Sequence, residues 1–330
     1  MRTMVLEAPG RPLALRERPV PRPAAGEVLV RVSACGVCRT DLHLCDGELP
    51  DPRLPVVPGH EVVGRVLATG AGVAGLVAGQ RVGIPWLASA CGRCRYCREG
   101  RENLCESARY TGYTEDGGFA THAIADARYV LALPDRYDDV HAAPLLCAGL
   151  IGHRAWTMTG DARVVGLYGF GAAAHLIAQI AIAEGREVHA YTRPGDVAAQ
   201  ALARRLGAAW AGGSDERGPA LLDAAILFAP VGALVPVALA ATRPGGTVVC
   251  AGIHMSDIPS FPYRLLWRER SLRSVANLTR EDGERFMAAA ARIPLEVHAV
   301  PYALARANEA LDDLRGGRLA GAAVLTMPSD

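Results

Sequence analysis

The chain of 330 residues contains no lysine, so its 35 basic side chains are all arginine and nearly balance its 34 acidic side chains. The formal net charge of +1 gives no general electrostatic attraction to nucleic acid or to an anionic membrane, and we expect neither as a partner. Only 21% of the residues are charged, whereas 50% are hydrophobic. This composition and length predict a globular protein with a large core, divided into two domains.

The sequence also lacks a recognisable export signal, because residues 1–25 contain arginine, glutamate and several prolines but no apolar run. An uncharged stretch at residues 224–241 is interrupted by Pro230, Gly232 and Pro236. It therefore fits a buried strand, a turn and the start of a helix better than a membrane span. We expect a cytoplasmic protein, and seven of its nine cysteines fall into ligand-like spacings, which favours metal binding over disulfides.

The first candidate site combines Cys35-Gly-Val-Cys38 with Pro-Gly-His60-Glu61. Cys38 and His60 supply a thiolate and an imidazole, which are ligands that zinc prefers, and Glu61 adds a carboxylate. A redox dithiol, or one buried cysteine and one core histidine, would explain the same residues. The residues Thr40, Asp41 and His43 follow directly. Their hydroxyl, carboxylate and imidazole could form a proton path or orient the metal ligands.

Four further cysteines have the spacing C-x2-C-x2-C-x7-C, namely Cys91, Cys94, Cys97 and Cys105. Four neighbouring thiolates can form a tetrahedral zinc site with no open position, which is typical of structural zinc. An iron–sulfur cluster is the competing interpretation, but its usual run has a shorter last spacing and a proline where Glu106 stands. Cys147 lies in an apolar stretch. It is either a small buried residue or a third ligand beside Cys38 and His60, which would leave zinc one open position.

After Arg163 the chain alternates apolar strands with helical stretches, which predicts a parallel sheet covered on both faces. Between a strand at 164–167 and a helix at 172–183, Gly169-Phe170-Gly171 forms a turn suited to a pyrophosphate at a helix N-terminus. Matched to G-x-G-x-x-G from Gly166, the stretch has Tyr168 at the second glycine and so departs from the usual pattern. A closely packed turn that binds nothing is the alternative.

The next strand ends near Thr192 and Arg193, where an NAD-selective site carries an acidic residue for the adenosine ribose. Thr192 offers a neutral hydroxyl instead, and Arg193 offers a guanidinium suited to phosphate oxygens. We therefore expect a preference for NADP(H) over NAD(H). If Arg193 only caps the turn or stacks on adenine, either cofactor would be accepted.

With these motifs in order, the sequence resembles the zinc-dependent alcohol dehydrogenases of the medium-chain dehydrogenase/reductase family. The resemblance rests on CGVCRTDLH, PGHE, the four-cysteine stretch and PLLCAG, and it extends over essentially the whole chain. It implies an α/β fold with a GroES-like β-rich catalytic domain at 1–149, including a zinc lobe at about 90–106. A Rossmann domain with a doubly wound parallel sheet would follow at 150–289, and residues 290–330 would return to the catalytic domain.

The resemblance also implies the roles of individual residues and two zinc ions per chain. Cys38, His60 and Cys147 would hold a catalytic zinc, with Glu61 and Asp41 close by, and the four clustered cysteines would hold a structural zinc. Thr40 and His43 match the family's proton relay, and Trp86 matches an aromatic residue of the small-alcohol pocket, although it could be a core residue. Matches to cofactor-binding positions are Arg39, Gly166, Gly169, Phe170, Gly171, Thr192 and Arg193. At Ala322 the chain lacks an arginine that many members carry.

The implied reaction is the interconversion of small primary alcohols and aldehydes by hydride transfer with a nicotinamide cofactor, in a homodimer or homotetramer. A zinc-free quinone or enoyl reductase on the same fold is one alternative, which the Cys38, His60 and Cys147 set disfavours. A zinc-ribbon module that binds nucleic acid is a second alternative. The near-zero net charge and the dinucleotide-binding pattern disfavour it.

Overall fold

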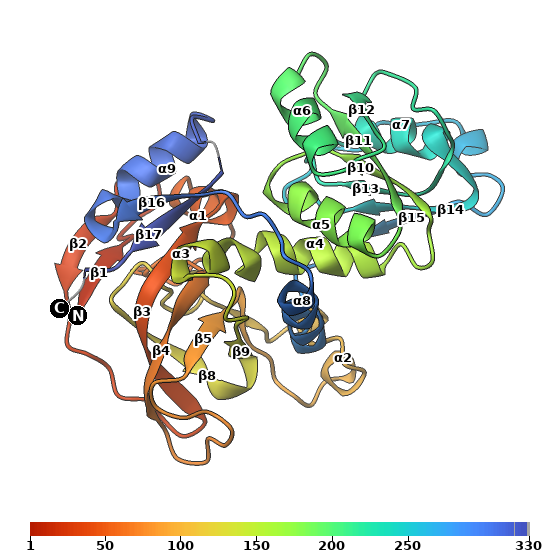
Figure 1. Cartoon of the computed structure of the whole chain (residues 1–330). Helices are drawn as coiled ribbons and strands as arrows, with labels where there is room; N and C mark the ends of the chain where they lie inside the picture. Colours follow the sequence, from red (N-terminus) through yellow and green to blue (C-terminus); the bar gives the residue numbers. More distant parts are fainter. Residues whose placement is uncertain (320, 329–330) are drawn as a thin grey trace. The chain divides into compact units, whose positions relative to one another are not determined.

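The computed structural model describes residues 1–319 and 321–328, so residues 320 and 329–330 of the expected returning segment lie outside the described residues. The chain forms two compact units (Figure 1): Met1–Cys147 with Asn277–Asp330, and Ala148–Ala276. The sequence places the return of the chain near residue 290. In the structure the first unit resumes at Asn277, because helix α8 (Arg280–Arg292) packs against β9 (Leu131–Ala132).

The first unit is built on a sheet whose seven strands, within the described residues, have the order β16-β17-β3-β4-β5-β9, with β8 also pairing with β3. Buried valines such as Val30, Val32 and Val62 fill its core, as expected for β-branched residues on a pleated surface. The strands are β3 (Glu27–Val37), β4 (Glu61–Thr69), β5 (Arg81–Ile84), β8 (His122–Asp126), β9, β16 (Ala299–Ala303) and β17 (Ala322–Thr326).

The last described strand joins this sheet beside the first candidate site. β17 pairs antiparallel with the end of β3, where Ala323 lies opposite Val37 and Thr326 opposite Ala34. Helix α9 (Ala307–Arg315) contacts β16 and β17, and it lies along them in Figure 1. The C-terminal segment therefore supports the strand that leads into Cys38.

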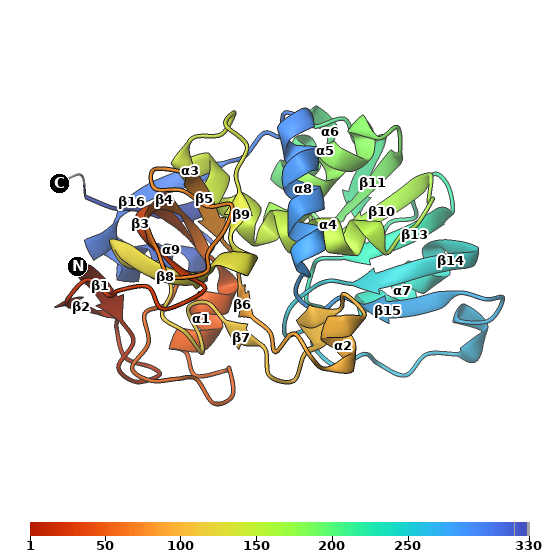
Figure 2. The same ribbon diagram turned by 90° about the horizontal axis from the view of Figure 1, so that it is seen from below.

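Short elements surround the sheet of the first unit. The β1–β2 hairpin, drawn in dark red beside the N-terminus in Figure 2, precedes it, and β6 pairs with β7 in a separate two-stranded ribbon. These elements are β1 (Arg2–Val5), β2 (Ala14–Glu17), α1 (Arg39–Cys45), β6 (Leu87–Ser89), α2 (Arg95–Arg98), η1 (Glu102–Leu104), β7 (Arg109–Tyr110), η2 (Ala127–Tyr129), α3 (Asp139–Ala142), η3 (Ala143–Leu146) and η5 (Leu304–Arg306).

The second unit contains a sheet of six described strands in the order β12-β11-β10-β13-β14-β15, and every pairing in it is parallel. This confirms the predicted parallel α/β arrangement. The strands are β10 (Val164–Tyr168), β11 (Glu187–Thr192), β12 (Trp210–Gly213), β13 (Leu222–Leu227), β14 (Thr242–Cys250) and β15 (Ser271–Ser274). The helices are α4 (Ala148–Thr157), α5 (Ala172–Ala183), α6 (Val197–Arg205), α7 (Leu234–Ala241) and η4 (Tyr263–Leu265).

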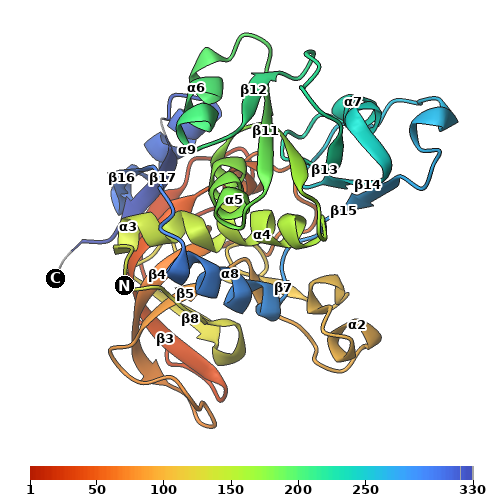
Figure 3. The same ribbon diagram turned by 45° about the vertical axis from the view of Figure 1, so that its right-hand side comes forward.

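Helices cover this sheet because its strands are apolar on both faces. Figure 3 shows α5 beside β11, and α5 contacts both β10 and β11, while α7 packs with the core that contains Tyr168 and Tyr191. The uncharged stretch at 224–241 forms the end of β13, a turn and α7, as the sequence predicts. None of the helices in the described residues combines the length and the hydrophobicity that crossing a membrane requires.

Candidate active site and metal centres

Four side chains of the first unit gather into one cluster: Cys38, His60, Glu61 and Cys147. Their ligand-type atoms all lie within 4.8 Å of one another. The Cys38 Sγ is 3.2 Å from the His60 Nε2 and 4.0 Å from the Cys147 Sγ. Because the four come from three separate segments, with His60 and Glu61 adjacent at the start of β4, the fold brings the predicted catalytic ligand set together.

The cluster is rich in acidic groups that are buried together. The hydrogen bond from the Cys147 thiol lowers the pKa of Cys38 well below its ordinary value, and the same bond together with burial raises the pKa of Cys147. Burial raises the pKa of Glu61, and its Oε2 atom has no hydrogen-bond partner among the described residues. A divalent cation would neutralise these groups, and two sulfurs with one imidazole are a zinc-type donor set. The residues present therefore fit zinc.

Asp41 connects the two segments that carry these side chains. Its Oδ2 accepts a hydrogen bond of 2.9 Å from the Cys38 backbone N–H, and its Oδ1 accepts one of 3.1 Å from the Gly59 N–H. Its Oδ1 also lies 3.4 Å from the His60 Nδ1. Burial alone would lower the pKa of His60, but the charges of Cys38 and Asp41 raise it well above its ordinary value. Asp41 therefore lies where a residue that orients His60 would lie.

The glycine of the Cys35-Gly-Val-Cys38 motif is required by Glu61. Gly36 lies opposite Glu61 in the β3–β4 pairing, and a Cβ atom at Gly36 would lie 1.8 Å from the Glu61 Oε2. Cys35 is fully buried in the hydrophobic core and does not belong to the metal-type cluster. The redox-dithiol interpretation of this motif therefore has no support in the fold.

The predicted proton path lies on α1. The Cys38 side chain caps this helix by accepting a hydrogen bond of 3.3 Å from the Thr40 N–H, and Thr40 is buried beside it. His43 lies further along the same helix with 18% of its side chain exposed, and its Nδ1 forms an ion pair with Glu48. Arg39 is exposed at the start of the helix. Glu48 was not identified from the sequence, because an isolated glutamate in a loop carries no pattern.

The His60 imidazole contacts one aromatic ring, Trp86, on which two tyrosines stack. The ring of Trp86 meets it edge-on, with centroids 4.9 Å apart and planes at 77°. Tyr110 and Tyr113 both stack on Trp86, at 5.1 Å and 5.8 Å. Trp86 therefore borders the metal-type cluster, and its role in a substrate pocket stays a prediction. The two tyrosines were missed, since only the β6–β7 pairing brings Tyr110 next to this indole.

The four cysteines after β6 form a second cluster. The described residues thus contain two clusters of metal-ligand type. Backbone N–H groups already point at their sulfurs, from Cys94 to the Cys91 Sγ and from Cys97 to the Cys94 Sγ, both at 3.4 Å. Hydrogen bonds from the Arg93 and Cys94 backbone lower the pKa of Cys91 to about 6. N–H groups around thiolates prepare such a loop for a closed zinc site, and the set Cys91, Cys94, Cys97 and Cys105 fits one.

The structure corrects the predicted register of the glycine fingerprint in the second unit. Gly166 lies inside β10, where a Cβ atom would be 2.4 Å from Leu222, so packing in the sheet explains this glycine. The turn begins at Gly169, whose φ of +86° favours glycine, and Gly171 caps α5 with open space around it. Counted from Gly169, the residues match G-x-G-x-x-A and end at the buried Ala174. The predicted departure at Tyr168 is therefore wrong.

Of the two residues at the end of β11, only Arg193 is exposed. Thr192 is 2% exposed, and its hydroxyl contacts the Gly212 carbonyl at 3.2 Å and accepts a hydrogen bond of 3.1 Å from Gln200. Its hydroxyl is thus used inside the fold, and the predicted contact between Thr192 and a ribose is not supported. Phe170 is buried within the turn, so its contribution there is packing.

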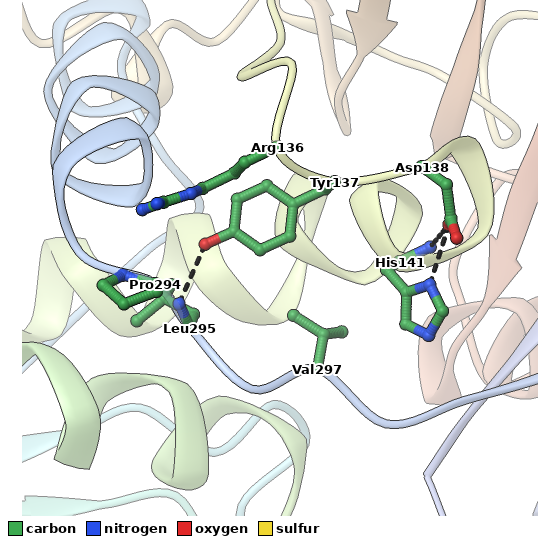
Figure 4. Close-up of a pocket in the computed structure, with 7 residues that line it drawn as sticks. All are labelled: Arg136, Tyr137, Asp138, His141, Pro294, Leu295 and Val297. Atoms are coloured by element: carbon green, nitrogen blue, oxygen red, sulfur yellow. Dashed lines mark hydrogen bonds and ion pairs between the residues drawn. The ribbon is translucent and has the colours of Figure 1, made fainter.

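A separate cavity of about 230 Å³ lies in the first unit (Figure 4). Its polar side chains bond within the fold. Tyr137 accepts a hydrogen bond of 2.9 Å from the Leu295 N–H, and the His141 Nδ1 lies 2.7 Å from Asp138. The cavity shares no residue with either cysteine cluster. It is lined by Arg136, Tyr137, Asp138, His141, Pro294, Leu295 and Val297.

Comparison with known proteins identifies relatives of this chain. Residues 24–135 match the family model of the alcohol dehydrogenase GroES-like domain. A probable alcohol dehydrogenase, AdhA, of Mycobacterium tuberculosis is 50% identical over 93% of this chain and 90% of its own length. An alcohol dehydrogenase of Geobacillus stearothermophilus is 36% identical over the full length of both chains.

Solved structures of similar fold carry the groups that these sites would hold. A thermostable alcohol dehydrogenase from Pyrobaculum aerophilum with bound cobalt and zinc has 28% identity and a TM-score of 0.87, covering 99% of each chain. Acetophenone reductase from Geotrichum candidum with NAD has 27% identity and a TM-score of 0.87, covering 98% of this chain and 96% of its own. A dehydrogenase from Sinorhizobium meliloti 1021 bound to NADP has 27% identity and a TM-score of 0.86, covering 98% of each.

Proposed function

This chain belongs to the alcohol dehydrogenases of the medium-chain dehydrogenase/reductase family, and we propose that it is a zinc enzyme that interconverts small primary alcohols and aldehydes. It is an NAD(P)-dependent alcohol oxidoreductase by that membership. The observation that carries the proposal is the buried group of two thiols, one imidazole and one carboxylate around Cys38.

Cys38, His60 and Cys147 would hold the catalytic zinc, with the Glu61 carboxylate next to it. A zinc ion bound by three protein ligands supplies a Lewis acid that polarises the substrate oxygen. A nicotinamide cofactor supplies the hydride acceptor or donor. The shared proton of the Cys38–Cys147 pair would leave on metal binding, because zinc binds thiolates rather than thiols.

The protein's own residues prepare the site for this chemistry. Asp41 fixes the orientation of His60 and of the Cys38 backbone at the same time. The Thr40 hydroxyl, buried beside Cys38, accepts the proton of the substrate hydroxyl, and His43 delivers it to solvent with Glu48 as the partner of its imidazole. Asp41 therefore acts by orienting its neighbours, whereas Thr40 and His43 act by transferring a proton.

The size of the substrate is set by Trp86 in this proposal. Its indole stands against His60 and is backed by Tyr110 and Tyr113, so it leaves little room next to the metal. Small primary alcohols and their aldehydes should therefore be preferred to long or branched ones. The competing assignment as a zinc-free quinone or enoyl reductase does not explain why Cys38, His60 and Cys147 are gathered and buried together.

The second cluster would hold a structural zinc ion, which gives two zinc ions per chain. Its four thiols, Cys91, Cys94, Cys97 and Cys105, offer no open position for a substrate. All nine cysteines lie in the described residues as free thiols, which suits a reducing compartment such as the cytoplasm.

For the cofactor we propose a preference for NADP(H), and this now depends on Arg193 alone. Its exposed guanidinium at the end of β11 suits the 2′-phosphate, and no carboxylate takes the ribose position at Thr192.

We also propose a homodimer or homotetramer. β15 is the last strand in the order of its sheet, and Tyr263 and Trp267 are exposed near it at 67% and 57%.

The test is a spectroscopic assay of purified protein with alcohols of graded length and either NAD or NADP. Formation of reduced nicotinamide with ethanol or propanol, abolished by a chelator and restored by zinc, is the expected result. Trp86→Ala should improve longer and branched alcohols relative to ethanol. A chelator-insensitive reaction with quinones or enoyl compounds would replace this proposal with the zinc-free alternative. If Trp86 is only a core residue, its variant would lose stability with selectivity unchanged.

A further inference from the structure

Tyr113 joins the pocket wall to a loop of which the proposed mechanism uses only Glu48, the partner of His43. This Pro50 loop comprises residues 46–57, between α1 and the His60 segment. Tyr113 lies in a turn after β7, and its ring and its hydroxyl contact different parts of the molecule. The two contacts can therefore be separated by substitution.

The Tyr113 ring is stacked almost parallel on Trp86, with an interplanar angle of 12°. Tyr110 also stacks on that indole, and the two tyrosine rings lie 6.2 Å apart, so the three rings form one group. The turn that carries Tyr113 rests against the residue before His60. A Cβ atom at Gly112 would lie 2.7 Å from the Gly59 N atom. The stack thus has a fixed base beside the metal-type cluster.

The Tyr113 hydroxyl donates a hydrogen bond to the Pro50 carbonyl, and the Arg53 N–H donates one of 3.2 Å to the Tyr113 carbonyl. Burial, followed by the charge of Asp51, raises the pKa of Tyr113, so the hydroxyl keeps its proton as a donor. The same loop carries Glu48, the partner of His43. One tyrosine therefore holds both the loop and the indole.

We propose that Tyr113 is a positioning residue for substrate specificity, whose ring holds Trp86 against His60 and whose hydroxyl holds the Pro50 loop. This inference rests on the proposed function, because specificity requires an alcohol substrate. Holding Trp86 requires the aromatic ring of Tyr113, whereas holding the Pro50 loop requires its hydroxyl. Phenylalanine preserves the stack and removes only the bond to Pro50, whereas leucine removes both.

The experiment compares Tyr113→Phe and Tyr113→Leu in the full-length zinc-loaded protein, with Tyr263→Leu as a control because that exposed tyrosine belongs to the second unit. The first readout is the ratio of kcat/KM for a branched alcohol to that for ethanol. The second is the fluorine resonance of Trp86 in protein labelled with 5-fluorotryptophan, assigned by its loss in Trp86→Phe. The third is amide hydrogen exchange in the Pro50 loop.

We expect Tyr113→Leu to shift or broaden the Trp86 resonance and to raise the branched-to-ethanol ratio by roughly 2- to 10-fold, the range of one aromatic pair. Tyr113→Phe should leave that resonance in place and increase exchange in the Pro50 loop. An unchanged selectivity ratio in Tyr113→Leu overturns the specificity role, and an unchanged resonance overturns the positioning of Trp86. Should the leucine variant not fold, Tyr113→Met keeps the volume without the ring.

Failure of the proposed function would look different. In that case the wild type forms no reduced nicotinamide with any alcohol, while the fluorine resonance and the loop exchange still report whether Tyr113 positions Trp86. Activity with normal selectivity in all variants, in contrast, would leave the proposed function intact and remove the role of Tyr113.

Discussion

Cys147 and Cys97 each supply one thiol to a different cluster, so their replacement should separate the roles of the two metals. Cys147→Ala should lose one zinc ion and lower kcat by about 10³-fold or more, because Lewis-acid stabilisation is worth several kcal/mol, yet remain folded. Cys97→Ala should lose the other ion and lower Tm by roughly 5–10 °C as its main effect. Metal analysis and thermal unfolding measure both. Fully active wild type with one zinc or none would contradict this prediction.

His43 ends the proposed proton path, and its imidazole forms an ion pair with the Glu48 carboxylate. His43→Ala should slow alcohol oxidation by about 10-fold, most strongly at low pH, where solvent bases that could replace it are scarce. Added imidazole should restore part of the rate. His141→Ala is a suitable control, since that histidine is paired with Asp138 outside the site. Identical pH profiles for wild type and His43→Ala would make His43 an ordinary surface residue.

Arg193 and Thr192 are adjacent, but we expect their substitutions to affect cofactor preference differently. Arg193→Ala should raise the KM for NADP(H) by about 10-fold and change that for NAD(H) much less, because a guanidinium–phosphate pair is lost. Thr192→Val should leave the cofactor preference unchanged and lower stability, because its hydroxyl bonds inside the fold to the Arg193 and Gly212 carbonyls and to the Gln200 side chain. Steady-state kinetics with both cofactors measures this. A wild type that uses NAD(H) better at equal concentration would refute the assignment.

At the scale of elements, the zinc lobe is attached to α8 through Glu102 of η1. This buried carboxylate accepts hydrogen bonds from the Arg280 backbone N–H at 3.0 Å and from its guanidinium at 3.1 Å. Burial alone would raise the pKa of Glu102, but these bonds lower it below its ordinary 4.5. A lowered pKa means that the pair stabilises the fold above about pH 4.5 and that this stability disappears as the pH falls through the folded pKa.

Glu102→Gln should therefore lower Tm by a few degrees at neutral pH and reduce the acid dependence of unfolding below pH 4.5. Thermal unfolding across this pH range measures both effects. Glu99→Gln in the same lobe is the matched control, because its carboxylate is about half exposed and lies 3.7 Å from Arg101, where it should contribute little. Equal effects of the two substitutions would show that the attachment to α8 is unimportant.

The elements that could be predicted from sequence are those with a local signal. The strand, glycine turn and helix from Val164 to Ala183 were expected in that order, and so was the four-cysteine loop. The register of the fingerprint failed because the role of Gly166 depends on Leu222, a contact that only the sheet creates. Tyr113 was missed for the same reason, since its partner Trp86 lies in another segment. Glu48 lies only five residues after His43 and was missed because an isolated glutamate in a loop carries no pattern.

At the scale of the whole molecule, both metal-type clusters belong to the first unit, whereas the parallel sheet belongs to the second. Chelation of zinc should therefore increase hydrogen exchange in β3, β4 and the zinc lobe and leave β10 to β14 protected. Exchange followed by mass spectrometry measures this directly. Restoring zinc should reverse the change. If both units lose protection together, the metals stabilise the whole chain cooperatively, and the division into separately stabilised units would be incorrect.

The pairing of β17 with β3 also constrains how the protein is made on the ribosome. The end of β3 precedes Cys38, but its partner strand begins only at Ala322. At about 5–20 residues per second, synthesis of the intervening chain takes on the order of 15 to 60 s. The residues of the second unit all emerge in this interval, while part of the edge of β3 waits unpaired. Nascent chains should thus be most prone to aggregation, and most dependent on chaperones, until β17 has been synthesised and pairs with β3.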